Sequence, residues 1–335
     1  LSPGNNVRQS DSTLVGRVVS RGVTRVRYPI NIFCMTGFDT VRAYLEYGDS
    51  LFKDKYNIGW WPWELSVWPG LLHSAFERVN EIWAATQFTR VMYETSTHIP
   101  VHLMPLPVSV ARVEFCSRAT LGIPDSKFLF LYVFDFNSYL ERKNPAAVIS
   151  AFRLAFPDQD ESVGLVLKTM NTDSDNPLWQ QFRLSCLQDK RITLLDQTMT
   201  RSQVLGLIES CDVYVSLHRS EGFGRTLAES MLFGKPVVAT DYSGTCDFLT
   251  PDTGFPVQWT EQSVRQNDYP FVMEGEAVWA NPDINHAARQ MVQARKESAN
   301  PAFINRVRSY SVQQFSAKRI GLLMRDRLLN CFQSL

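Results

Sequence analysis

Two glutamates flank a glycine-rich turn in the stretch SLHRSEGFGRTLAESMLFGKPVVAT, residues 216–240. Gly222 and Gly224 let the backbone approach a ligand closely, and the free N–H groups of the helix expected to follow make an anion site. A carboxylate at Glu221 repels phosphate, so it must face another group, and vicinal hydroxyls suit its two acceptor oxygens. Glu229, just over one turn into the helix, is placed for a second hydroxyl pair. A phosphate binder between two hydroxyl readers describes a nucleotide-sugar site.

Basic side chains lie near two other predicted strand ends. Arg142 and Lys143 lie in a turn just after the apolar run 128–136. Lys168 stands near the carboxyl end of the run 162–170, where the simpler interpretation is a solvated lysine. Open parallel sheets bind their ligands beyond the carboxyl ends of the strands, and the glycine turn after the run 212–218 lies at such an end.

These residues need a sheet that gathers the strand ends. From about Leu106 onward, short β-branched or aromatic runs alternate with segments of helical periodicity, which is typical of βαβ units. The pattern indicates a doubly wound α/β domain with a mostly parallel sheet. The predicted strands are 128–136, 162–170, 191–196, 212–218 and 236–240, and the predicted helices are 141–156, 176–188, 202–211 and 225–234.

The first hundred residues follow a different pattern. Four tryptophans fall within 57–69, which predicts a packed irregular loop, and 70–94 is predicted to be one helix with a break near 82–84. The prolines of 100–108 indicate a linker between domains. At the other end, 316–332 has the periodicity of an amphipathic helix.

Composition limits the function classes. Lys plus Arg and Asp plus Glu both number 34, so no global basic field favours nucleic acid. The 335 residues suit two domains, and six scattered cysteines suit reduced thiols in a cytosolic protein. No apolar run reaches the roughly 20 residues of a membrane span. Since the chain opens on LSPGNNVRQSDST without Met, we expect the N-terminal domain to be incomplete.

The central motif resembles that of a known family. S-E-G-F-G-R-T-L-A-E, followed by M-L-F-G-K-P-V-V-A-T and D-Y-S-G, is similar to the donor-site signature of glycosyltransferase family 4, with its Glu-x7-Glu pair. The resemblance implies the GT-B architecture, in which two Rossmann-like domains face each other across a cleft. It implies an acceptor-side domain over 1–106, a nucleotide-sugar domain over 107–315, and a last helix, 316–335, that crosses back to the first domain.

The resemblance also assigns roles to single residues. Glu221 would contact hydroxyls of the transferred sugar, Glu229 would hold the ribose, and Lys143 matches the family lysine for the diphosphate. The family arginine is expected near Ser138, so this chain departs there and Arg142 is the candidate substitute. The turn 241–245 would line the diphosphate or base, unless it is a plain strand-end turn. The expected donor set is Lys143, Arg142, Lys168, Gly222, Phe223, Gly224, Arg225, Thr226, Glu229, Ser243 and Gly244.

Two more residues join Glu221 as catalytic candidates. Glu64, in NIGWWPWEL, resembles the end of a W-x-W-E-L segment whose cleft wall faces the acceptor and the transferred sugar; the alternative is an aromatic plug with Glu64 in a salt bridge. His218 ends a predicted strand beside Glu221 and is expected to shape the sugar pocket. The residues that resemble remnants of a donor-reaching glycine loop are Gly4, Asn5 and Asn6.

The resemblance implies a retaining, metal-independent transfer of a hexose, without a cofactor, from a nucleoside diphosphate to a hydroxyl of a glycan or lipid-linked acceptor. Mannose on GDP is the first donor to try. Polysaccharide or lipopolysaccharide biosynthesis in the cytoplasm is expected, with peripheral membrane association through the acceptor and no nucleic-acid partner. Three alternatives stay open: a sugar-nucleotide epimerase of the same fold, a catalytically silent nucleotide-sugar binding protein, and a phosphorylase. The sequence contains no motif that supports the phosphorylase.

Overall fold

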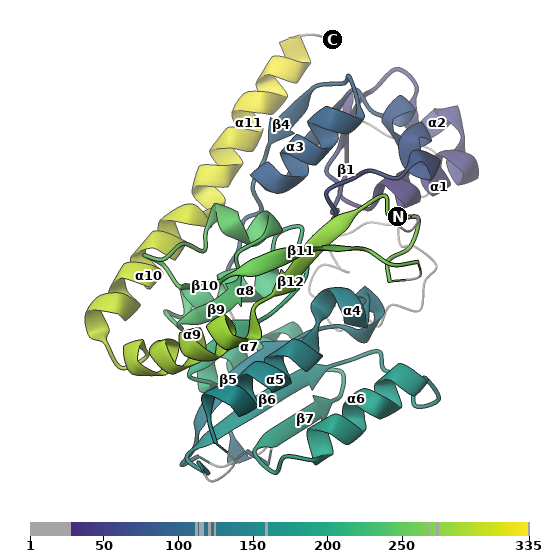
Figure 1. Cartoon of the computed structure of the whole chain (residues 1–335). Helices are drawn as coiled ribbons and strands as arrows, with labels where there is room; N and C mark the ends of the chain where they lie inside the picture. The colour runs from purple at the N-terminus through teal and green to yellow at the C-terminus, as the bar shows by residue number, and fades with distance from the viewer. Residues whose placement is uncertain are drawn as a thin grey trace.

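Two parallel sheets organise the chain, and each is the centre of one domain (Figure 1). The computed structural model describes residues 28–333, except 111–112, 114–116, 120–121, 124, 158–159, 267 and 273–274. The N-terminal domain is built around a four-stranded sheet and the C-terminal domain around a six-stranded sheet. The predicted α/β class is confirmed.

The N-terminal sheet has the order β1-β2-β3-β4 with all pairs parallel. Short helices surround it, and a core of packed aromatic side chains lies beside it. The strands are β1 (Ile30–Phe33), β2 (Tyr56–Gly59), β3 (Glu81–Ala84) and β4 (Val101–Leu103), and the helices are α1 (Gly37–Tyr47), α2 (Asp49–Phe52), a 3-10 helix (Gly70–Arg78) and α3 (Gln87–Ser96).

Two predictions for this domain are wrong. Residues 70–94 are not one broken helix, because strand β3 separates the 3-10 helix from α3. All four β3 residues are buried, since the strand lies between β2 and β4 and its backbone is satisfied by the sheet. The segment 100–108 is not only a linker, because β4 forms the edge of the sheet.

The C-terminal sheet has the order β10-β9-β8-β5-β6-β7, again all parallel. The alternation predicted between 128 and 240 is present, except that Asn144, with a φ of 51°, divides the expected helix 141–156 into α4 and α5. The strands are β5 (Phe128–Val133), β6 (Val163–Thr169), β7 (Ile192–Asp196), β8 (Val213–Ser216), β9 (Val237–Thr240) and β10 (Phe255–Val257), and the helices are α4 (Leu140–Lys143), α5 (Pro145–Ala155), α6 (Pro177–Leu187), α7 (Arg201–Ser210) and α8 (Arg225–Leu232).

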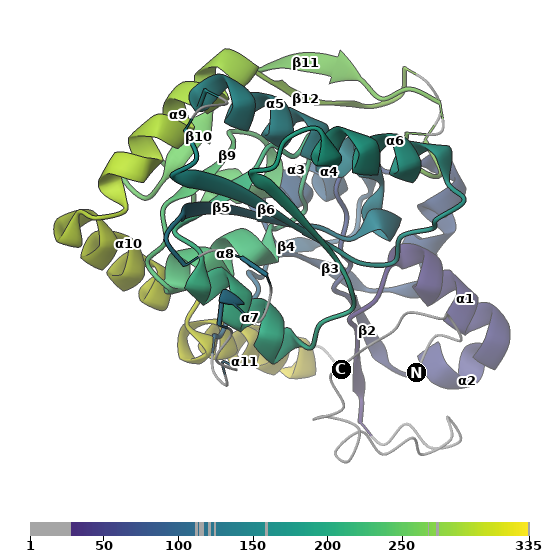
Figure 2. The same ribbon diagram turned by 90° about the horizontal axis from the view of Figure 1, so that it is seen from below.

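The double winding of this sheet sets the place of the site. Helices α5, α6 and α9 (Ile284–Glu297) cover one face and α7 and α8 cover the other (Figure 2). Strands β5 and β8 are neighbours, with Phe130 opposite Val213. The turns that follow these two strands therefore open at the same edge of the sheet, which is where such folds bind ligands.

A hairpin that the sequence patterns did not predict connects the two domains. Strands β11 (Trp259–Ser263) and β12 (Val278–Pro282) pair antiparallel and reach from the C-terminal domain toward α1 (Figure 1). Five buried residues on or next to the hairpin belong to the hydrophobic core of the N-terminal domain, beside Trp63 and Trp68: Val264, Tyr269, Val272, Ala277 and Trp279.

The last helices make a second connection. Helix α10 (Pro301–Gln314) is followed by α11 (Ala317–Gln333), which runs along the N-terminal sheet (Figure 1). Cys331 of α11 is buried in a small cluster with Ile58 and Trp83. The guanidinium of Arg327 forms an ion pair with the buried carboxylate of Glu81.

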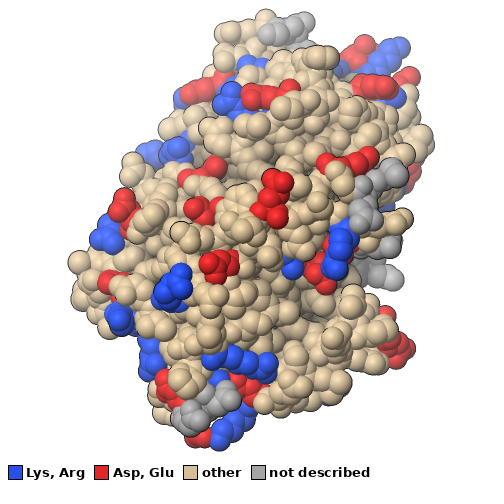
Figure 3. All heavy atoms as spheres, viewed as in Figure 1, with Lys and Arg blue, Asp and Glu red and all other residues tan. Residues whose placement is uncertain are grey.

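The surface carries both signs of charge. On the face shown in Figure 3, acidic and basic side chains are interspersed, and neither sign fills a continuous field. In the described part of the chain, the helices all lack the length and apolar character that a membrane crossing requires.

Candidate functional site

A cavity of about 410 Å³ lies between the two domains at the glycine turn after β8. One wall belongs to the N-terminal domain and consists of the segment 60–64 with Cys34, Ala85, Thr89 and the nearby Leu106. The other wall is the stretch 221–225 of the C-terminal domain. The turn predicted to meet a ligand therefore faces a cleft between domains, and Glu64 stands opposite it.

Glu221 is held by two bases. Its carboxylate pairs with the Lys143 ammonium and lies 3.4 Å from the Arg142 guanidinium. Burial opposes the ionisation of this carboxyl, but Lys143 and Arg142 outweigh burial and lower the pKa of Glu221 to about 2. Burial lowers the pKa of Lys143, against the opposing effect of Glu221. The carboxylate and the two predicted phosphate-binding bases thus form one charged group beside the cavity.

The turn after β9 fixes the backbone of Glu221. The Glu221 N–H donates to the Ser243 hydroxyl at 2.8 Å, and the Gly244 N–H donates to the Glu221 carbonyl at 2.9 Å. Ser243 has a φ of 67°, a conformation uncommon outside glycine. The structure therefore brings Ser243 and Gly244 to the first glutamate, as supporting residues.

Gly222 lies at one of the contacts between the two domains. A side chain on Gly222 would overlap the Trp63 carbonyl oxygen. The Thr86 hydroxyl of the N-terminal domain donates to the Gly222 carbonyl at 3.0 Å. Glycine is required at 222 because a backbone from the other domain occupies the place of Cβ.

The start of α8 completes this wall. Gly224 has a φ of 85° and precedes Arg225, the first residue of the helix, whose side chain is exposed. Phe223 is buried against Phe248, so its ring is part of the core. The Thr226 hydroxyl accepts a hydrogen bond from the Tyr214 hydroxyl at 2.7 Å. The helix start, with its free N–H groups, therefore belongs to the wall of the cavity, which Gly224 and Arg225 line.

Arg142 joins both domains at Glu64. Its guanidinium lies 3.6 Å from the Glu64 carboxylate while it also faces Glu221, and the combined effect of these carboxylates raises the pKa of Arg142 despite its burial. The Tyr269 hydroxyl, from the segment between β11 and β12, donates to the same Glu64. Both interpretations of Glu64 from sequence meet here: it is salt-bridged, and its side chain remains 27% exposed at the cleft.

His218 does not reach the cavity. It is fully buried, with Nδ1 3.0 Å from the Ser216 hydroxyl and Nε2 3.4 Å from the Thr245 hydroxyl. Burial lowers its pKa to about 4, so the ring is neutral near neutral pH. Because His218 does not line the cavity at Glu221, its predicted influence on the sugar pocket stays a prediction.

Lys168 is also buried, contrary to the simple interpretation of a solvated lysine. Its ammonium donates to the Thr169 carbonyl at 2.7 Å, and burial lowers its pKa to about 8 against the opposing effect of Asp196 and Asp135. It does not line the cavity at Glu221.

Glu229 lies deeper in α8 and has a different partner. Its carboxylate is 2.8 Å from the guanidinium of Arg201, the first residue of α7. Burial raises the pKa of Glu229, and Arg201 opposes that effect. Arg201, whose side chain is 38% exposed, covers the glutamate. Glu229 does not border the cavity at Glu221.

Sequence reasoning missed three residues around this site. Arg201 pairs with Glu229, and Tyr269 binds Glu64, but both lie far along the chain from their partners. Tyr139 has a φ of 65° beside the basic turn, which no periodicity reveals. The residues predicted to form a remnant glycine loop, Gly4, Asn5 and Asn6, lie outside the described residues.

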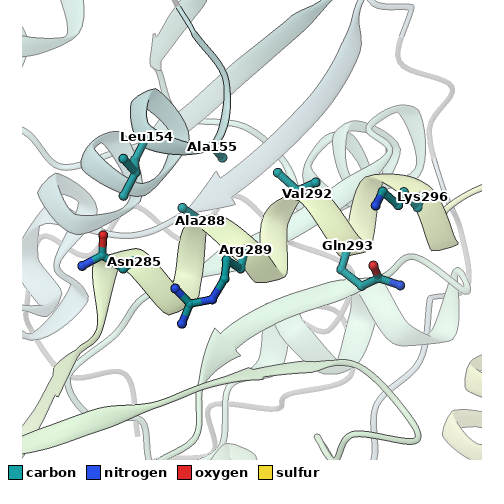
Figure 4. Close-up of a pocket in the computed structure, with 8 residues that line it drawn as sticks. All are labelled: Leu154, Ala155, Asn285, Ala288, Arg289, Val292, Gln293 and Lys296. Carbon is teal, nitrogen blue, oxygen red and sulfur yellow. The ribbon is translucent and has the colours of Figure 1, made fainter.

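Another hollow, of about 420 Å³, lies away from these residues (Figure 4). It is formed by the last turn of α5 and one side of α9, with Leu154 facing Ala288 and with Arg289 and Lys296 at its edge. Across the ranges that the structure describes, no three His, Cys, Asp or Glu side chains gather as a metal site.

Comparisons with known proteins agree with this geometry. Residues 116–263, which make up most of the C-terminal domain, match the family model described as Glycosyl transferases group 1. No curated protein sequence matches the chain.

Solved structures share the fold at low identity. HepE from Anabaena, in complex with UDP and glucose, has a TM-score of 0.68 and 14% identity, with 90% of this chain and 78% of that chain covered. Sucrose-phosphate synthase from Thermosynechococcus elongatus has a TM-score of 0.66 and 16% identity, covering 92% and 75%. The pneumococcal O-GlcNAc transferase GtfA, in complex with UDP and GlcNAc, has a TM-score of 0.55 and 13% identity, covering 84% and 54%. These likenesses confirm the GT-B fold.

Proposed function

We propose that this protein is a glycosyltransferase that moves a sugar residue from a nucleoside diphosphate to an acceptor hydroxyl. The observation that carries the proposal is the group of Glu221, Arg142 and Lys143 beside a cavity between two Rossmann-like domains. The match of 116–263 to group 1 glycosyl transferases supports the same reaction class.

The charges suggest how the group works. In the free protein, Glu221 neutralises Lys143 and faces Arg142. A bound diphosphate offers these bases a stronger partner, which frees the carboxylate to accept hydrogen bonds from sugar hydroxyls. As the sugar leaves, negative charge grows on the diphosphate, and the two bases with the α8 N–H groups stabilise it. The bases and amides supply this stabilisation without a metal ion or cofactor.

The finer assignments belong to the same proposal. We infer a hexose donor, retention at the anomeric carbon with the acceptor proton passing to the departing phosphate, and ribose binding near Glu229. The acceptor is a glycan or lipid-linked oligosaccharide in polysaccharide or lipopolysaccharide assembly, met in the cytoplasm at a membrane face. We also propose that the acceptor-side domain spans 1–106 and the nucleotide-sugar domain 107–315, with the last helix in 316–335.

A thermal-shift series with UDP, GDP, ADP and TDP tests the donor site. Binding to the folded state raises the melting temperature in proportion to the logarithm of ligand concentration over Kd. HepE was solved with UDP and glucose, so UDP joins GDP as a first choice. We expect one nucleotide to raise Tm in the wild type and much less in Lys143→Ala. A flat response to all four nucleotides would contradict the proposal.

Product analysis separates the alternatives. Incubation of the purified protein with the binding nucleotide sugar alone would give an altered free sugar if the protein were an epimerase. A silent binding protein would show the Tm shift but no transfer to any acceptor extract. A phosphorylase would require inorganic phosphate for release of a sugar phosphate. We expect nucleoside diphosphate release that depends on acceptor.

A further inference from the structure

A second cavity, of about 300 Å³, lies on the other side of the Trp63–Glu64 segment from the cavity at Glu221. It is formed by the start of α1, the turn before α4 and the 269–271 part of the hairpin connection. This volume is at the small end of the about 300–1,000 Å³ range of ligand sites and suits one sugar ring.

The rim of this cavity holds aromatic side chains in a strained backbone. Tyr139 has a φ of 65° and Phe271 a φ of 66°, which for bulky residues are true outliers. In the described ranges they are the aromatic residues with positive φ, and both line this one cavity. Such strain persists where the surrounding structure enforces it, commonly at ligand sites.

The rings on this rim remain open to solvent. Phe271 stacks on Phe38 with a centroid distance of 5.5 Å, and Tyr139 lies 4.9 Å from the ring of Tyr269. Phe38, Tyr139 and Phe271 are 45%, 39% and 41% exposed. Burial in a core therefore does not explain why these aromatics hold unfavourable backbone angles.

Polar groups share the cavity with the rings. Asp39, Asn137 and the partly exposed Glu64 line it. A pyranose presents an apolar C–H face and a ring of hydroxyls, which match aromatic faces and carboxylate or amide oxygens respectively. An alkyl chain would bury these polar groups further without offering them a hydrogen bond. We propose that this cavity binds a sugar ring of the acceptor, so that the acceptor is a glycan or glycoside recognised through a pyranose.

The position of Glu64 connects the two cavities. Glu64 lines both, and Arg142 lies within 3.6 Å of it while also facing Glu221. A ring held against Phe271 would present a hydroxyl at Glu64, next to the transferred sugar. This inference rests on the proposed glycosyl transfer and adds the place where a sugar ring of the acceptor is bound.

The strain offers a clean test, because glycine accepts positive φ without cost. Phe271→Gly and Tyr139→Gly remove a ring and relieve the backbone, so we expect Tm to be maintained or raised. The matched control is Asp54→Gly, which relieves a φ of 57° at an exposed residue outside either cavity. Phe271→Trp keeps an aromatic face and should keep binding.

The probes are the methyl glycosides of mannose, glucose, galactose and N-acetylglucosamine, followed by saturation-transfer NMR. We expect at least one glycoside to bind the wild type and Asp54→Gly, and to bind at least about five-fold more weakly to Phe271→Gly and Tyr139→Gly. Equal binding to all variants, or binding of none of the four glycosides, would overturn the proposal. Ring-dependent binding of farnesyl phosphate instead would also overturn it, in favour of a lipid.

A nucleotide measurement on the same proteins keeps the two proposals apart. Nucleoside diphosphate affinity should be unchanged in the glycine variants, because neither ring lines the cavity at Glu221. If the nucleotide binds and the glycosides do not, only the acceptor inference fails. If no nucleotide binds, the proposed function fails first.

Discussion

Two buried carboxylates connect parts of this molecule that are distant in sequence: Glu221 at the cleft and Glu81 beneath the last helix. Glu81 is fully buried and accepts hydrogen bonds from Tyr56, Trp83 and Arg327. Burial opposes its ionisation, but these hydrogen bonds, that of Arg327 foremost, lower its pKa. Glu221 also has a lowered pKa, yet its partners are two bases beside a cavity.

The difference between them is access. Glu81 lines none of the cavities described above, so a ligand bound in one of them would not compete with Glu81 for its partners. The proposed function requires that the bases at Glu221 exchange their carboxylate for a phosphate. Burial and a shifted pKa therefore do not distinguish a structural ion pair from a binding site here, whereas an adjacent cavity does.

Glu221→Gln should give the largest effect on activity. It keeps the shape of the side chain but removes the charge, and we expect turnover to fall by about 10³-fold. The bare nucleoside diphosphate should bind as well as before or more tightly, since its competitor for Lys143 is weakened. Initial-rate kinetics and calorimetry measure the two quantities. Unchanged turnover would remove Glu221 from the site.

Glu81→Ala should show the opposite behaviour. Leaving Arg327 without its buried partner should cost about 3 kcal/mol of unfolding free energy, measured by urea denaturation. Nucleotide affinity should stay the same at concentrations where the variant is folded. The double variant Glu81→Leu with Arg327→Leu should recover part of the loss. A drop in nucleotide affinity without a loss of stability would show that Glu81 serves binding and not structure, contrary to our expectation.

Lys143→Ala tests whether the cleft bases bind phosphate. A charge-assisted hydrogen bond of this kind is worth about 2 kcal/mol, so affinity for the bare nucleoside diphosphate should fall roughly 30-fold. The outcome is read by calorimetry, with Lys190→Ala, an exposed lysine paired with Glu161, as the control. Equal affinities in the two variants would contradict a phosphate role.

Glu229→Ala should have a smaller effect. If Glu229 holds the ribose, nucleotide affinity should fall about ten-fold while turnover at saturating donor changes little. Glu209→Ala, an exposed glutamate of α7, serves as the control. A loss of turnover with unchanged affinity would place Glu229 nearer the chemistry than we propose.

Lys168→Met addresses the buried lysine and should give the smallest effect. Because its folded pKa of about 8 lies below the ordinary 10.5, the unfolded chain binds more protons between these values. The free energy of unfolding of the wild type should therefore rise as pH rises through this window. The rise should be absent in Lys168→Met. Melting curves across the window measure it. Reduced nucleotide affinity in Lys168→Met would instead support the predicted donor role.

The C-terminal domain was predictable because its signals are local. The run at β5 is continuously apolar, the runs at β6 and β8 are apolar except toward their carboxyl ends, and the glycine turn with its two glutamates lies within fourteen residues of β8. Parallel pairing then places Arg142 and Lys143 beside Glu221, as the expected strand ends required.

The N-terminal domain was harder because its signals are tertiary. Strand β3 has only four residues and includes Glu81, whose burial depends on Arg327 from the far end of the chain. Tyr269 reaches Glu64 across 205 positions. Gly222 is required by the Trp63 carbonyl of the other domain. Local patterns of hydrophobicity cannot reveal partners that lie so far apart in the sequence.

The hairpin also affects how the protein is made. The core of the N-terminal domain includes Trp279, so this core cannot close until the ribosome has synthesised most of the chain. N-terminal domains commonly fold first during synthesis, but here the early segment must wait with Trp61 and Trp68 uncovered. A nascent chain arrested before β11 would expose a tryptophan-rich surface and become a substrate for chaperones.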